Sequence, residues 1–67
     1  MCLAIPGKIK SIDEKNNNAV VDFSGIIKIV NVSLIKPKVD NCVLVHAGFA
    51  IEIINKAEAN EIKKLLH

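Results

Sequence analysis

The feature that most constrains this chain is the shortness of its apolar runs, which turn signals interrupt every few residues. Strand-length runs occupy residues 8–14, 19–23, 26–32, 42–47 and 49–54. The asparagine-rich stretch 15–18 and the pair Ser24-Gly25 are typical of tight turns. In a chain of only 67 residues, short antiparallel strands favour a curled sheet or a small barrel, since closure removes exposed strand edges.

Several local details refine this outline. Pro6-Gly7 predicts a break before the first strand; it could hold the first residues away from the sheet, although the pair alone favours an ordinary loop. Residues 33–41, interrupted by Pro37, are expected to form a connection, and Gly48 is expected to mark a bulge or sharp bend. Alternation in the last strand places Phe49, Ile51 and Ile53 on one face and Glu52 on the other.

The final segment changes its period from strand to helix. Asn55 is a candidate N-cap, and Glu58, three residues later, completes a pattern typical of a capping box. One helical face collects the apolar residues Ala59, Ile62, Leu65 and Leu66. We therefore predict one mainly β domain over residues 1–67. Its barrel spans about 1–54, and a short α-helix at about 55–67 covers one end of it.

Composition narrows the function. A domain this short has a thin core and too little chain to enclose a deep catalytic cleft, which favours a binding or carrier module over an enzyme. All nine basic residues are lysines, and the only aromatic residues are Phe23 and Phe49. Base recognition relies on arginine, and single-strand binding relies on aromatic platforms, so neither is favoured. The absence of a leader or an apolar span predicts a cytoplasmic protein that is not bound to a membrane.

Cys2 is the first candidate for chemistry. Removal of Met1 would leave its thiol beside an α-amine, and a nearby positive charge favours the thiolate. A thiolate and an amine on one residue could chelate a soft metal. Position alone nevertheless favours an inert terminal cysteine, so this pattern does not decide the role of Cys2.

His46 and Cys42 lie in the same apolar run. The imidazole of His46 could bind a metal or exchange a proton near neutral pH, but a single histidine in a strand is more often structural. Cys42 has valine and leucine neighbours, which favours a small buried apolar residue without metal chemistry. In a reducing compartment both cysteines are expected to be free thiols rather than a disulfide.

Four blocks of sequence resemble those of the HypC/HupF hydrogenase-maturation chaperones, and together they cover essentially the whole chain. They are Met1-Cys2-Leu3-Ala4-Ile5-Pro6-Gly7-Lys8, Val21-Asp22-Phe23-Ser24-Gly25, Asn31-Val32-Ser33-Leu34 and Val43-Leu44-Val45-His46-Ala47-Gly48-Phe49-Ala50-Ile51. The opening block and the last block at this spacing are the most specific part of the match. The residues Asp40-Asn41-Cys42 depart from the family pattern, which often has an aromatic residue there.

The resemblance implies an OB-like barrel and a role in assembling the iron centre of nickel–iron hydrogenases. It implies two partners, the scaffold protein HypD and the precursor of the hydrogenase large subunit. The cargo implied is a transient Fe(CN)₂CO fragment. The family's N-terminal cysteine corresponds to Cys2, which would hold the iron, and its strand histidine corresponds to His46, near the iron. The expected partner-binding residues are Cys2, Leu3, Ala4, Ile5 and Pro6.

Two other functions compete with this one. A small barrel could bind single-stranded nucleic acid, which would show a steep loss of affinity with salt. A thiol enzyme could instead combine Cys2 with His46 and Cys42, but the sequence offers no third orienting group.

Overall fold

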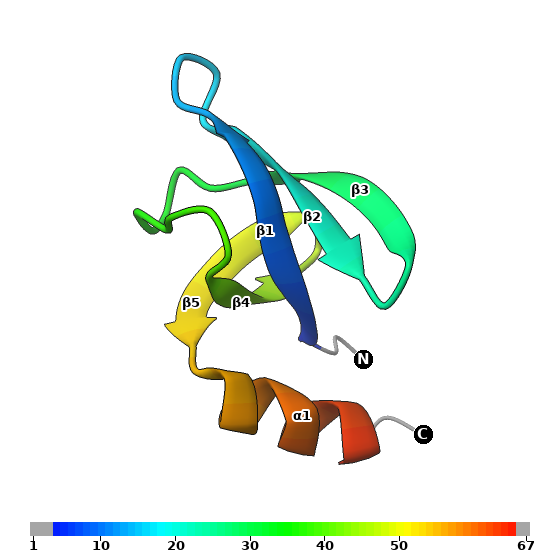
Figure 1. The fold of residues 1–67 in the computed structure, drawn as a ribbon. Coiled ribbons are helices and arrows are strands. Elements are labelled where there is room, and N and C mark those ends of the chain that lie inside the picture. The colour runs from blue at the N-terminus through cyan, green and yellow to red at the C-terminus, as the bar shows by residue number, and fades with distance from the viewer. Residues whose placement is uncertain (1–3, 66–67) are drawn as a thin grey trace.

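The computed structural model describes residues 4–65, which form strands and one helix (Figure 1). The elements are β1 (Ile5–Asp13), β2 (Asn18–Phe23), β3 (Ile26–Asn31), β4 (Cys42–His46), β5 (Phe49–Ile54) and α1 (Lys56–Leu65). The strands close into a barrel in the order β1-β2-β3-β5-β4. The predicted fold class, a five-stranded barrel followed by a short helix, is therefore confirmed.

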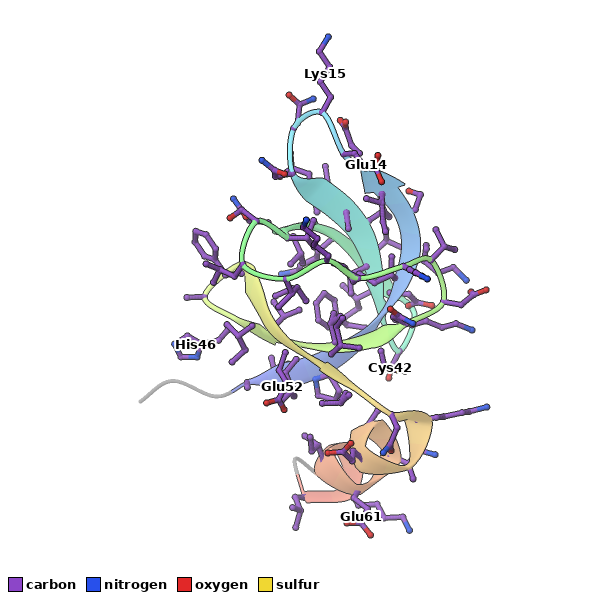
Figure 2. The ribbon with its side chains drawn as sticks, turned by 90° about the vertical axis from the view of Figure 1, so that its left-hand side faces the viewer. Glu14, Lys15, Cys42, His46, Glu52 and Glu61 are labelled. Carbon is purple, nitrogen blue, oxygen red and sulfur yellow. The ribbon has the colours of Figure 1, made fainter. Side chains whose placement is uncertain are left out.

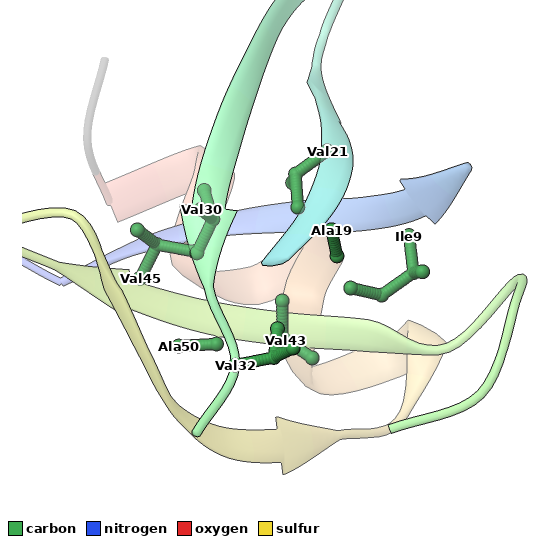
Figure 3. Close-up of a cluster of buried hydrophobic side chains, with 8 residues drawn as sticks. All are labelled: Ile9, Ala19, Val21, Val30, Val32, Val43, Val45 and Ala50. Carbon is green, nitrogen blue, oxygen red and sulfur yellow. The ribbon is translucent and has the colours of Figure 1, made fainter. Parts of the chain in front are cut away.

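The core is small and aliphatic, as expected from the scarcity of aromatic residues (Figure 3). Its members are Ile9, Ala19, Val21, Val30, Val32, Val43, Val45 and Ala50. Side chains of Ile9, Val21 and Val43 are completely buried. Burial of a branched aliphatic side chain is worth roughly 1.5–3 kcal/mol, so these residues are the main stabilising contacts of the barrel.

Two hairpins are closed by two-residue turns. Ser24 and Gly25 have φ angles of 53° and 100°, and Ala47 and Gly48 have φ angles of 52° and 83°. Two consecutive positive φ angles match the twist of the flanking strands. The prediction at Ser24-Gly25 is confirmed. The sharp bend expected at Gly48 is a hairpin turn. The bulge of this hairpin lies within the paired strands, where the β4–β5 register shifts between Leu44 and Val45.

The predicted break at Pro6-Gly7 is wrong. Both residues belong to β1, where they pair with Leu44 and Val43 of β4, and both are buried. The missing N–H of Pro6 is tolerated because β2 pairs with β1 only from Lys8 onward. Gly7 is required by sterics, since a Cβ at this position would collide with the side chains of Val21 and Phe23.

The interpretation of β5 also changes. Alternation suggested a common face for Phe49, Ile51 and Ile53, but these three residues are 42–44% exposed. The small residue Ala50 is the one buried in the barrel core. The register shift in the β4–β5 pairing inserts one extra residue into β5 and so interrupts simple alternation.

The capping box at the start of α1 is confirmed. The backbone N–H of Glu58 donates to Asn55 Oδ1 at 2.7 Å, and the N–H of Asn55 donates to Glu58 Oε1 at 3.3 Å. The helix packs against β1 and β4 and lies below the barrel in Figure 1. Of the predicted apolar face, Ala59 is buried, Ile62 is half-buried and Leu65 is 84% exposed, while Leu66 lies outside the described residues. Among the described residues, no helix is both long and apolar enough to cross a membrane.

Candidate functional site

The structure describes only part of the N-terminal segment that the sequence predicts to bind iron and partners. Cys2 and Leu3 lie outside the described residues. Of the other expected partner-binding residues, Ala4 is half-buried, Ile5 is 47% exposed and Pro6 is buried. Ile5 is therefore the described residue of this set that presents most apolar surface to a partner.

His46 is the last residue of β4 and immediately precedes the turn Ala47-Gly48. Its side chain is half-buried, and none of the hydrogen bonds between described residues involves the imidazole ring. In Figure 2 it lies at the same side of the barrel as the start of β1. A structural role based on hydrogen bonding, which the sequence pattern alone favoured, has no support within this part of the chain.

Strand pairing brings His46 close to the start of β1. Ile5 pairs with Val45, so continuing the antiparallel register by one residue places Ala4 opposite His46. Directly opposed residues of antiparallel strands have Cα atoms about 4.5–5.5 Å apart. We refer to Ala4, Ile5, His46 and the turn Ala47-Gly48 as the β1–β4 corner.

Cys42 occupies the other end of β4 (Figure 2). It is half-buried, pairs with Lys8 of β1 and Ile54 of β5, and has no disulfide partner among the described residues. Four residue steps of extended strand separate it from His46, a Cα separation of roughly 13 Å. That separation is too large for the two side chains to bind one metal ion or act on one substrate atom.

An apolar groove adjoins the β1–β4 corner, and sequence analysis did not find it. Its volume is about 490 Å³, and its lining is Ile5, Phe23, Ile26, Lys28, Ile29, Val30, Val45, Ala47 and Gly48. The sequence of residues 26–29 did contain a signal for this exposed apolar surface. Ile26 and Ile27 are adjacent in a strand, so their side chains point to opposite faces and only one of them can face the barrel core. Their side chains are 61% and 55% exposed.

The described residues contain no cluster of three or more metal-binding side chains from histidine, cysteine, aspartate or glutamate. The described part of the corner offers one such donor, the imidazole of His46. A closed structural metal site normally has four protein ligands. This corner can therefore contribute to a weaker site that other groups complete.

The model of the HupF/HypC family matches residues 1–66 of this chain. The chain belongs to the HupF/HypC family. Hydrogenase maturation factor HypC of Escherichia coli strain K12 is 43% identical over 68 residues, which cover 91% of this chain and 73% of the relative. HypC of Synechocystis sp. is 38% identical over 66 residues, which cover 91% of this chain and 87% of the relative.

Another relative is HypC of Azotobacter chroococcum, which is 39% identical over 67 residues and is covered to 79% of its length. Membership in the HupF/HypC family makes this chain a hydrogenase maturation factor that works with other proteins of that process. The family consists of maturation chaperones rather than catalysts, in agreement with the expectation that this chain is not an enzyme.

Proposed function

We propose that this HupF/HypC member carries an Fe(CN)₂CO fragment from HypD to the precursor of the hydrogenase large subunit. The thiolate of Cys2 holds the iron, and His46 provides a second contact. Ala4 and Ile5 contribute to the surface that the two partners use in turn, and the protein works in the cytoplasm. The observation that supports this proposal best is the register of β1 and β4, which places Ala4, two residues after Cys2 in the sequence, opposite His46.

Chain geometry keeps the two proposed contacts within reach of each other. An extended chain advances at most about 3.6 Å per residue, so two residue steps span at most about 7 Å. Ala4 in turn lies opposite His46 in the continued register. Only two residue steps separate Cys2 from Ala4, so the proposal requires no long-range movement of the chain to bring both side chains to one iron atom.

The chemistry of the two side chains suits a carrier. A thiolate is a soft donor that binds iron well, and an imidazole is a common additional ligand. Two protein ligands hold a metal less firmly than the four of a closed structural site. A partner that offers more ligands can therefore remove the fragment, which is the behaviour that delivery requires.

The deciding experiment is anaerobic co-expression of the chain with HypD, followed by purification and infrared spectroscopy. We expect the complex to show CN and CO stretching bands. The Cys2→Ala variant should lose these bands and its complex with HypD while its circular dichroism stays native. A Cys2→Ala complex with undiminished bands would refute the proposal.

Cys42 provides the matched control. The Cys42→Ala variant removes the same functional group at a position about 13 Å along β4 from His46. We expect it to retain both infrared bands and the complex. The His46→Ala variant should keep HypD binding but lose part of the iron, since the thiolate remains the principal ligand.

A further inference from the structure

The edge of β3 beside the groove is open along most of its length. β3 pairs with β2 from Ile26 to Asn31, whereas its other edge pairs with β5 only at Asn31 and Phe49. Between residues 26 and 30, no strand of the described chain covers that edge. Figure 1 shows β3 curving away from β5 beyond this single meeting point. An uncovered strand edge is a template for pairing with another chain.

The turn geometry identifies which backbone groups face the open edge. A two-residue turn of this type makes its flanking residues, Phe23 and Ile26, a hydrogen-bonded pair. Lys28 and Val30 then also bond to β2, because hydrogen-bonded pairs alternate along antiparallel strands. The backbone groups of Ile27, Ile29 and Asn31 consequently point the other way. The N–H of Asn31 confirms this direction, since it donates to the carbonyl of Gly48 at 2.9 Å.

The side chains of residues 26–30 are apolar apart from the one positive charge of Lys28. Ile27 and Ile29 are 55% and 72% exposed. Of the described residues that line the groove, Lys28 is the only charged one, and no acidic residue among them neutralises it. Hydrogen bonding therefore favours an extended backbone at this edge, the groove favours apolar side chains, and Lys28 favours an acidic side chain between them.

We propose that an extended segment of a maturation partner adds to β3 as a further strand. The segment would be mainly apolar with one acidic side chain that faces Lys28. Its backbone would hydrogen-bond to the N–H and C=O groups of Ile27 and Ile29, as in other cases of strand addition. This inference rests on the proposed function for the identity of the partners, because the groove is continuous with the β1–β4 corner through Ile5 and Ala47-Gly48.

The positive charge also disfavours one arrangement in which a second copy of this chain would be the occupant. Two β3 edges that pair antiparallel about Lys28 would place two lysine side chains directly opposite each other. Like charges at directly opposed positions destabilise a sheet. An acidic partner segment meets no such repulsion.

The test compares Ile29→Pro with Ile29→Thr. Proline removes an N–H that points to the open edge and leaves the bonds to β2 in place, whereas threonine shortens the side chain and keeps the N–H. We expect Ile29→Pro to weaken the anaerobic complex with HypD or with the large-subunit precursor by about tenfold or more, since a lost edge bond leaves a partner carbonyl unpaired. Ile29→Thr should weaken it by about threefold.

Two further measurements distinguish the occupants. Lys28→Glu should weaken the same complex by about fivefold at low salt. Amide exchange at Ile27 and Ile29 should be fast in the free protein and slow in the complex. Unchanged binding of folded Ile29→Pro to both partners would overturn the strand-addition proposal, as would slow exchange of these amides in the free monomer or in a self-associated form. Failure of the proposed function is a separate result, because it appears as iron binding and complex formation by Cys2→Ala.

Discussion

The pairing of β1 with β4 and the pairing of β3 with β5 close the same barrel but differ in length. We call them the β1–β4 seam and the β3–β5 seam. β1 and β4 pair from Ile5–Val45 to Lys8–Cys42, and the loop before β4 extends this contact. In that loop, Asp40 N–H donates to the carbonyl of Ile9, and the N–H of Ile9 donates to the carbonyl of Asn41, both at 2.9 Å. β3 and β5 share one residue pair, and beside it the isoleucines of β3 are exposed. The difference teaches that the same barrel can be closed by a long strand pairing on one side and by a single residue pair that leaves a strand edge uncovered on the other.

The largest expected effect is on the free energy of unfolding, and it compares Ile9 of β1 with Ile29 of β3. Ile9→Ala removes a completely buried side chain and should lower the free energy of unfolding by about 2–5 kcal/mol. Ile29→Ala should change it by less than about 0.5 kcal/mol, because that side chain is 72% exposed. Urea unfolding of both variants measures the contrast, and Ile9→Val provides a milder change if Ile9→Ala does not fold. Equal losses for the two alanine variants would contradict this division of the barrel.

The second prediction concerns the tight approach of strands near the β1–β4 seam. Gly7→Ala should lower the free energy of unfolding by about 1–3 kcal/mol, because its Cβ would collide with Val21 and Phe23. Adding Val21→Ala to Gly7→Ala should cost less than the sum of the two single changes, since it removes one colliding group. Strict additivity in thermal or urea unfolding would show that the steric explanation is wrong.

A smaller effect is expected at the helix that packs on β1 and β4. Asn55→Ala removes the oxygen that accepts the N–H of Glu58 and should cost about 1 kcal/mol. Asn60→Ala, at an exposed position inside α1, is the matched control and should be neutral or slightly stabilising. Unfolding measurements on the two variants, with helix content from circular dichroism, make the comparison. A loss as large for Asn60→Ala as for Asn55→Ala would count against the cap.

The smallest expected effect concerns the pKa of Asp13, beside the turn that joins β1 to β2. Hydrogen bonds from the side chain and then the backbone of Asn16 lower the pKa of Asp13 below its ordinary value of 3.8. A lowered pKa means that the ionised carboxylate stabilises the folded turn above pH 3.8, and this contribution disappears as the pH falls through the lowered pKa. NMR titration should show this pKa, and Asn16→Ala should return it toward the ordinary value. An unchanged pKa in the variant would assign the shift to another group.

Local sequence signals determined much of this protein. The turn at Ser24-Gly25, the capping box of Asn55 and Glu58 and the number of strands all depend on residues close together in the chain. Their preferences for positive φ or for capping act within a few residues, so a pattern in the sequence is sufficient to predict them. The family blocks likewise identified His46 as a candidate without any knowledge of its neighbours.

Tertiary structure decided the features that depend on distant partners. Pro6 and Gly7 belong to β1 because β4 pairs with them. At residue 7, the side chains of Val21 and Phe23 leave room only for glycine. Ala50 is buried instead of its larger neighbours because a register shift against β4 changes which residues of β5 face the core. The open edge of β3 exists because β5 meets it at one residue only. Each of these outcomes is set by pairing between residues far apart in the chain, and local preferences contain no information about that pairing.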